Sequence, residues 1–297
     1  MDIEELIREG KYEEAINQVT GNDENSRMIR AFILLKAGKF EAVLKELEGM
    51  NNTEAHYLRF EAYKGLGNSE NAIKELEEVL KDRDYEHFLH YVLAEYLFTI
   101  KSYEKALIHI NKALEIMPYN YDYKFLKAKI LFEQGNYEDA SIYLTDVISM
   151  NPKNVEARLL KALCYYNVGL KMDALSEINK ALDFKKDDVL LHTLKAKIYF
   201  ETRFYKLALA EFKIAFRLNP NDPDLAYSIA TCYHLLSLNQ DAEMFIDKAI
   251  AMKLKGEYFA LKARIRKALG DLSSAKEYAL KAIKLDQKLR SQLEDLL

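Results

Sequence analysis

Hydrophobic positions in this chain recur at the spacing of an α-helix, in pairs of segments that are separated by short turns. The clearest pair flanks a Gly135-Asn136 turn and consists of Leu126, Ile130, Leu131, Ala140, Leu144, Val147 and Ile148. Spacings of three, four and seven residues place such side chains on one side of a helix. The pattern therefore predicts a hairpin of two antiparallel α-helices that pack through their apolar faces.

The hairpin pattern is repeated at a nearly constant step along the chain. Three columns of small residues keep this register, one in the first helix of each unit and two in the second. The columns are Ala94, Ala128, Ala162, Ala196, Ala230 and Ala263; Ala106, Ala140, Ala174, Ala208, Ala242 and Ala275; and Ala113, Val147, Ala181, Ala215, Ala249 and Ala282. Small residues let crossing helices approach closely. A fixed period of about 34 residues indicates a one-dimensional stack of repeats.

Turn and stop signals mark the same units. A left-handed residue is expected between the two helices, where glycine carries no steric cost. That column reads Lys101, Gly135, Gly169, Arg203, Ser237 and Gly270. Pro118, Pro152 and Pro220 follow the second helices of their units and stop them.

The run Gly135-Asn-Tyr137-Glu-Asp-Ala140, with Ala128 before it and Pro152 after it, resembles the tetratricopeptide repeat, a family with a 34-residue unit. The resemblance covers six regular repeats over residues 87–285. It implies an all-α fold, an α-α superhelix (solenoid) of helical hairpins with a right-handed path. We expect about eight hairpins, a partial unit at the N-terminus and one continuous solenoid over residues 1–297.

Both ends depart from the regular pattern. Over residues 1–86 the turn glycines Gly10, Gly38 and Gly67 are 28 and 29 residues apart, which predicts shortened helices or tighter connections. Over residues 286–297 a stripe of leucines suits one more amphipathic helix that caps the last unit, because terminal repeats need a polar outer face. The alternative is that two such helices pair to form a homodimer.

A basic column precedes the first alanine column, at a place where the family favours leucine. It reads Arg30, Arg59, Lys127, Lys161, Lys195 and Lys262, interrupted by Leu93 and Ile229. We expect the long stems to pack between helices while the charges reach water. The alternative is a cationic ladder that binds acidic ligands. The chain also has no tryptophan, a residue that the family usually carries in its first helix.

Composition and charge limit the classes of partner and the cellular compartment that we expect for this protein. The net charge is −4 and 30% of residues are charged, without runs of like charge, which disfavours nucleic acid and a polybasic membrane anchor as partners. An acidic N-terminus and the lack of a long apolar stretch predict a cytoplasmic protein that does not span a membrane. Cys164 and Cys232 lie two periods apart and should be reduced core thiols.

Motifs of catalysis and cofactor binding are missing from the sequence. It contains no GxxxxGK[ST] loop, GxGxxG turn, HExxH helix or CxxC pair. His87 and His90 lie three apart on one helix, but two histidines make an incomplete zinc site, so we interpret them as structural. We predict no enzymatic activity, no metal and no cofactor.

In the family, the first helices of successive units line a concave groove that holds a peptide. The corresponding positions here are rich in aromatic residues: Tyr91, Glu95, Phe98, Phe125, Lys129, Phe132, Leu159, Leu163, Tyr166, Lys197, Phe200, Tyr227 and His234. They would suit a ligand with an apolar face and some acidic residues. The alternative is that the aromatics only pack between units. The carboxylate clamp of one subgroup is mostly lacking, because leucines such as Leu126 and Leu160 stand where its asparagines are expected.

We therefore predict a non-enzymatic scaffold for protein–protein interaction, which binds a peptide or a partner helix in the concave groove. Two alternatives stay open. The chain could be a homo-oligomeric structural spacer assembled through its terminal helices. It could also be a regulator whose aromatic pocket around Phe98, Phe132 and Tyr166 senses a peptide or a small molecule. No motif identifies the partner.

Overall fold

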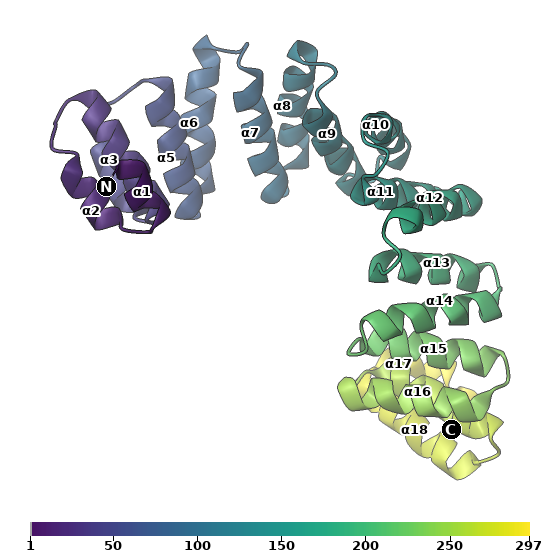
Figure 1. Ribbon diagram of the computed structural model, residues 1–297. Coiled ribbons are helices and arrows are strands. Elements are labelled where there is room, and N and C mark those ends of the chain that lie inside the picture. The colour runs from purple at the N-terminus through teal and green to yellow at the C-terminus, as the bar shows by residue number, and fades with distance from the viewer. Residues whose placement is uncertain (1) are drawn as a thin grey trace. The chain divides into compact units, whose positions relative to one another are not determined.

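The computed structural model describes residues 2–297, apart from the side chain of Asp82, and this part of the chain is helical without a β-strand. The described residues form eighteen α-helices (Figure 1). Sixteen of them pair into eight antiparallel hairpins: α1 (Ile3–Arg8) and α2 (Tyr12–Gln18); α3 (Glu24–Lys36) and α4 (Phe40–Glu46); α5 (Thr53–Gly65) and α6 (Ser69–Asp82); α7 (His87–Thr99) and α8 (Tyr103–Ile116); α11 (Val155–Asn167) and α12 (Lys171–Phe184); α13 (Val189–Glu201) and α14 (Tyr205–Leu218); α15 (Pro223–Leu235) and α16 (Asn239–Met252); α17 (Gly256–Ala268) and α18 (Leu272–Leu285). The other two helices, α9 (Tyr121–Glu133) and α10 (Tyr137–Met150), lie on either side of the Gly135-Asn136 turn in the sequence. The all-α hairpin architecture is thus confirmed.

The turn column has the backbone that the sequence predicts. Each of its six residues has a positive φ, including the three that are not glycine: Lys101 at 62°, Arg203 at 64° and Ser237 at 61°. Glycine adopts this conformation freely, whereas a Cβ makes it costly. The geometry of the hairpin therefore fixes the backbone at this position whichever residue occupies it.

The alanine columns form the centre of the hairpins. All members of the three columns are 0–1% exposed. Larger apolar side chains surround them in clusters that continue from one hairpin to the next, as where Leu225, Ile229 and Tyr258 join around Ala226 and Ala230. The core is therefore a continuous apolar layer within each stack of hairpins, which is how repeat arrays bury their surface.

The short N-terminal steps come from short second helices. Helices α2 and α4 have 7 residues each, whereas the second helices from α6 onward have 14. The first helices α3 and α5 keep the usual 13 residues. The missing turns account for the short steps between Gly10, Gly38 and Gly67.

The C-terminal segment differs in its backbone from the expected amphipathic helix. It forms two 3₁₀ segments, η1 (Gln287–Gln292) and η2 (Glu294–Leu296). Leu289, Leu293 and Leu296 nevertheless pack as a cap against α17 and α18, and Leu293 is 0% exposed. The segment folds back closely enough that a Cβ on Gly256 would stand 3.0 Å from Leu289 Cδ1.

Two compact units make up the chain, Met1–Gly135 (unit 1) and Asn136–Leu297 (unit 2). Unit 1 holds α1 to α9 and unit 2 holds α10 to α18. None of the described helices combines the length and the apolar character needed to cross a bilayer. Cys164 and Cys232 are both free and buried, and burial raises the pKa of each thiol to about 12.

Candidate functional site

In unit 1, the groove residues predicted from the sequence lie on one side of α7 and α9, which we call the first-helix face. None of the six, Tyr91, Glu95, Phe98, Phe125, Lys129 and Phe132, is fully buried, and Glu95 is exposed. They also contact one another and their neighbours. The ring of Tyr91 stacks on that of Tyr123 with centroids 4.9 Å apart, and Lys129 Nζ lies 4.1 Å from the centroid of Phe125. These aromatics therefore both pack between hairpins and reach the surface.

In unit 2, the equivalent first-helix face of α11, α13 and α15 carries the remaining seven predicted residues. Leu159, Leu163, Tyr166, Lys197, Phe200, Tyr227 and His234 are all partly or fully exposed. The Tyr166 hydroxyl donates a hydrogen bond to Glu201, whose other carboxylate oxygen lies 2.8 Å from Lys171 Nζ. Burial and Glu201 together raise the pKa of Tyr166 to about 12, so its hydroxyl stays a donor. Around Tyr166, the face in unit 2 is therefore polar, and its side chains bond to one another.

An apolar groove, which we call the α3–α5–α7 groove, lies on the first-helix face nearer to the N-terminus than any predicted residue. It has a volume of about 700 Å³ and its lining is mostly apolar. Phe32 from α3 and Phe88 from α7 are 42% and 52% exposed, which is unusual for residues of this size. The lining residues are Met28, Ile29, Phe32, Thr53, Glu54, Tyr57, Leu58, Arg83, Glu86, Phe88 and Leu89.

The sequence contained a signal for this groove. One regular step back from Tyr91 leads to Tyr57, and one shortened step further leads to Met28; the same steps from Glu95 lead to Glu61 and Phe32. The groove is thus the continuation of the predicted columns through the irregular units. It was missed because the columns were read only at the regular step.

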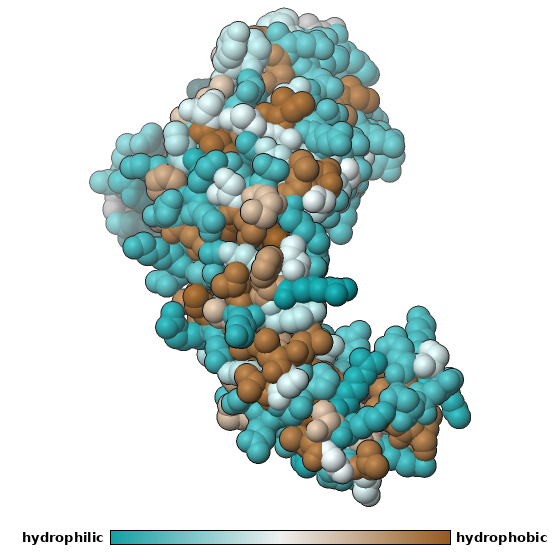
Figure 2. Space-filling model, turned by 90° about the vertical axis from the view of Figure 1, so that its right-hand side faces the viewer, coloured by the Kyte–Doolittle hydropathy of each residue, from teal (hydrophilic) through white to brown (hydrophobic). Residues whose placement is uncertain are grey.

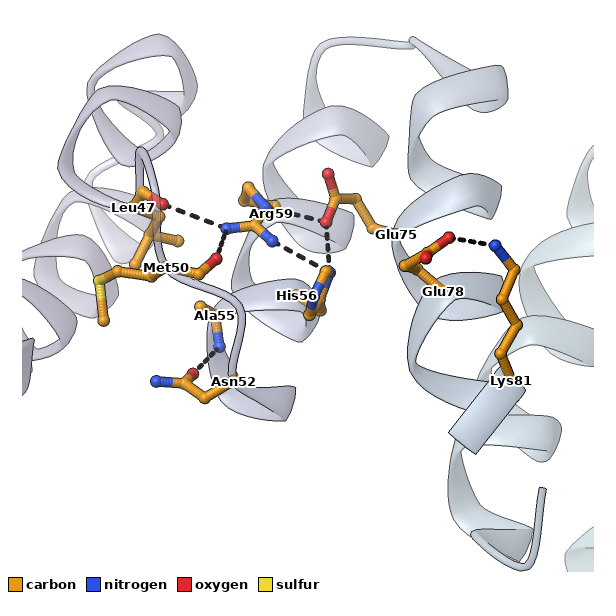
Figure 3. Close-up of polar contacts among 9 residues, drawn as sticks. All are labelled: Leu47, Met50, Asn52, Ala55, His56, Arg59, Glu75, Glu78 and Lys81. Carbon is orange, nitrogen blue, oxygen red and sulfur yellow. Dashed lines mark hydrogen bonds and ion pairs between the residues drawn. The ribbon is translucent and has the colours of Figure 1, made fainter. Parts of the chain in front are cut away.

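A polar pocket borders the α3–α5–α7 groove, and Arg83 lines both. The pocket has a volume of about 400 Å³ and lies beside the start of α5. There the side chain of Asn52 caps the helix by accepting a hydrogen bond from the Ala55 amide at 2.8 Å. His56, farther along α5, turns away from the groove towards Glu75 on α6 (Figure 3). The pocket is therefore held by contacts within the hairpin.

Four members of the basic column, Arg30, Arg59, Lys195 and Lys262, are paired with carboxylates inside the protein, which corrects the expectation that their charges reach water. Arg59 Nε lies 2.8 Å from Glu75 Oε2, and its Nη1 donates to the carbonyls of Leu47 and Met50 in the preceding connection (Figure 3). The acid stands 16 residues after the base. The same spacing joins Arg30 to Glu46 and Lys195 to Glu211.

A second basic column, three residues earlier, uses the same acids. His56 bonds to Glu75, Arg158 to Glu177 and His192 to Glu211, each 19 residues ahead and at 2.6–2.9 Å. These contacts join the first helix of a hairpin to its second helix. A cationic ladder for acidic ligands is therefore not favoured, because these charges already have carboxylate partners.

The two histidines considered as metal ligands point to different partners. His87 Nδ1 lies 2.7 Å from the Tyr123 hydroxyl, whereas His90 is 0% exposed and contacts His109 and Asp84. Among the described residues, no group of three or more His, Cys, Asp or Glu side chains is placed to hold a metal ion. Both histidines have structural contacts.

Family models match most of the repeat region. Two models described as tetratricopeptide repeat match residues 57–121 and 193–254, and residues 256–289. A model described as anaphase-promoting complex, cyclosome, subunit 3 matches residues 101–181. No curated protein sequence matches this chain.

Solved structures with the same fold have low sequence identity to this chain. A tetratricopeptide repeat protein from Parabacteroides merdae is 19% identical, with a TM-score of 0.61 over 82% of this chain and 98% of that one. PilF of Pseudomonas aeruginosa is 17% identical, with a TM-score of 0.58 over 71% and 99%. YrrB, described as a tetratricopeptide repeat protein with an unusual peptide-binding site, is 16% identical, with a TM-score of 0.52 over 61% and 94%.

The period, the left-handed turn column, the buried alanine columns and the family matches agree. The tetratricopeptide matches together cover more than half of the sequence. We conclude that this chain belongs to the tetratricopeptide repeat family.

Proposed function

We propose that this protein is an interaction scaffold that captures an apolar peptide segment or partner helix on its first-helix face, with the α3–α5–α7 groove as the main site. Repeat proteins of this family are typically non-catalytic scaffolds, and we propose no catalytic role here. The observation that carries the proposal is the groove itself, where Phe32 and Phe88 stay about half exposed beside Ile29.

Physical reasoning supports a protein ligand. A concave apolar site of several hundred Å³ suits a few large side chains, and exposed apolar patches of this kind mark interaction sites in soluble proteins. Charged groups at the edge, Glu54, Glu86 and Arg83, can orient a ligand without dominating its binding. A helix that places apolar residues at every third or fourth position would fill the groove.

We propose that the predicted columns in α9 of unit 1, and those in α11, α13 and α15 of unit 2, also contact a ligand, each within its own unit. The aromatic side chains in these columns are partly buried by packing between helices. We therefore propose that each contributes less to ligand binding than Phe32 or Phe88. The similarity in fold to YrrB, whose description names a peptide-binding site, is consistent with this use of the fold.

The homodimer alternative was based on the C-terminal leucines, and these pack within the chain itself. Leu289, Leu293 and Leu296 are 0–8% exposed against their own α17 and α18, so they do not present a free stripe to a second copy.

Site-specific photocrosslinking tests the proposal. A benzophenone amino acid at position 32 or 88 should form defined adducts in lysate of the native cell, and Phe32→Ser/Phe88→Ser should lose the same partner in a pull-down. Tyr119→Ser is the matched control, because Tyr119 is an aromatic residue in unit 1 that is 82% exposed outside the groove. Equal capture by the groove variant and the control would refute the groove as the main site.

A further inference from the structure

A row of exposed apolar residues lies on the hairpin turns of unit 2, away from the first-helix face. Leu170, Phe204 and Leu238 precede α12, α14 and α16 at equivalent positions of successive repeats, and are 50%, 60% and 48% exposed. We call these three residues the turn stripe. Figure 2 faces the edge of unit 2 that carries these turns, and hydrophobic side chains are gathered there in patches among hydrophilic ones.

Two of the other six second helices carry a polar side-chain cap at the equivalent position. Asn68 accepts a hydrogen bond from the Asn71 amide at the start of α6, and Asp271 accepts one from the Ser274 amide at the start of α18. The residues of the turn stripe leave the helix starts without a side-chain cap. Loss of such a cap costs about 1 kcal/mol per helix. Three consecutive hairpins thus lack a side-chain cap and expose an apolar side chain, so capping does not account for the apolar residue at this position.

The backbone beside the stripe carries a further cost. Arg203, next to Phe204, has a φ of 64° at a place where Gly135, Gly169 and Gly270 stand in other hairpins. A residue with a Cβ is strained there by about 1 kcal/mol. An exposed cation therefore occupies a position where glycine would be more stable.

A depression adjoins the middle of the stripe. It has a volume of about 450 Å³ and lies between α12 and the α13–α14 turn. Its apolar lining includes Met172, Leu175, Phe204 and Leu207, and Met172 is 75% exposed. The depression can accept one or two apolar side chains of a ligand.

Charges around the stripe have a defined order. In the central hairpin, Arg203 and Lys206 lie beside Phe204 and Leu207 and reach the surface, whereas Asp173 and Asp241 stand in the hairpins on either side. Lys171 is already paired with Glu201 at 2.8 Å. The surface is therefore apolar with a basic centre.

We propose that the turn stripe docks an amphipathic helix of a partner protein whose apolar face is flanked by acidic residues at its centre. The apolar side chains of the helix cover Leu170, Phe204 and Leu238 and enter the depression, while its central carboxylates meet Arg203 and Lys206. This surface is separate from the α3–α5–α7 groove and does not depend on it.

The test uses the full-length chain and two synthetic helices of equal length, each with leucines on one face and with either glutamates or lysines beside them at the centre. Fluorescence anisotropy should show that the glutamate helix binds at least tenfold more tightly than the lysine helix. Leu170→Asn/Phe204→Asn/Leu238→Asn introduces the residue type that caps α6 at Asn68. This triple variant should bind the glutamate helix at least tenfold more weakly than the wild type, while the Tm of the variant stays equal or rises.

Two variants keep the result decisive if the triple variant folds poorly. Arg203→Gly/Lys206→Gln should weaken the glutamate helix severalfold without weakening the lysine helix. The second variant, Phe32→Ser/Phe88→Ser, removes the α3–α5–α7 groove as another site for an apolar helix, and the loss caused by Arg203→Gly/Lys206→Gln should be the same in this background. The proposal is overturned if the wild type binds neither helix or binds both equally. It is also overturned if the triple variant keeps its affinity, or if its Tm falls, since a fall would make the three side chains packing residues.

Discussion

His90 Nδ1 lies 3.0 Å from His109 Nδ1, at the position where other hairpins place a base against a glutamate. Burial, followed by the charge of His90, lowers the pKa of His109 to about 4. Burial also lowers the pKa of His90, although Asp84 opposes this. Lys112 faces the pair as well and disfavours its protonation.

The histidine pair should make unit 1 less stable in acid. A pKa that is lower in the folded state than the ordinary value of 6.5 means that protons bind the unfolded chain more tightly. The contribution of the pair is complete above pH 6.5 and is lost as the pH falls from there towards 4. We expect the Tm, measured by circular dichroism, to fall as the pH is lowered from 7 to 5. His109→Glu should reduce this fall, because it restores the acid found at Glu75 and Glu211; an unchanged pH dependence would contradict the assignment.

Removal of one buried acid should destabilise the protein, because its basic partner is left buried without a counter-charge. Arg158 and Glu177 are 8% and 6% exposed and are joined at 2.9 Å. Glu177→Gln should lower the free energy of unfolding by about 3 kcal/mol, since an unpaired buried charge is left behind. Urea denaturation measures this loss, and Arg158→Met/Glu177→Leu should recover most of it. The exposed pair of Lys281 and Glu277 supplies the control, for which Glu277→Gln should change stability by less than about 0.5 kcal/mol.

Glycine should stabilise the three strained turns. Lys101→Gly, Arg203→Gly and Ser237→Gly each remove the cost of a Cβ at positive φ, and a gain of about 0.5–1 kcal/mol is expected after the greater freedom of glycine in the unfolded chain is subtracted. Gly135→Ala and Gly169→Ala should have the opposite sign, although a Cβ at either site meets no atom within 4 Å. Thermal unfolding of all five variants tests whether backbone conformation alone sets the sign.

The C-terminal leucines should act on stability and leave the oligomeric state unchanged. Leu293→Ala should cost about 2–4 kcal/mol, because a fully buried leucine is removed from a packed cluster. Calorimetry gives the loss, and light scattering on the same samples gives the mass. A wild-type dimer that becomes a monomer in Leu293→Ala would show that the leucines lie between two chains.

Local physics made the repeat predictable from sequence. Alanines such as Ala128 and Ala140 are small enough for two helices to cross closely, and Gly135 adopts a positive φ without steric cost. Their spacing was therefore enough to predict the hairpin and its turn. Arg59 and Glu75 lie on different helices of one hairpin, and only the packed structure shows that their spacing brings them together. From the sequence alone, the length of the basic side chains suggested that their charges reach water, and not that they pair with carboxylates in the same hairpin.

The α3–α5–α7 groove and the C-terminal cap were less predictable for different reasons. Phe32 belongs to the same column as Glu95, but the shortened second helix α4 broke the step that would have joined them. Leu289, Leu293 and Leu296 were correctly identified as an apolar stripe. Their spacing fits both an α-helix and two 3₁₀ segments, and contact with α17 and α18 decides between these.

The bonds of Arg59 fall into two kinds, side chain to side chain within its own hairpin and side chain to carbonyl across to the preceding one. Only the first kind requires a matching residue, since every chain offers carbonyls whatever its side chains. The hairpin of Arg59 thus carries this charge partner within itself, whereas other pairs, such as Lys262 with Asp247 and Arg266 with Glu243, cross to the preceding hairpin. Duplication or loss of the whole α5–α6 hairpin would keep Arg59 with Glu75, whereas a crossover at the turn between the two helices would separate them. Recombination at the connections between hairpins therefore preserves pairs of this first kind and breaks the pairs that cross a connection.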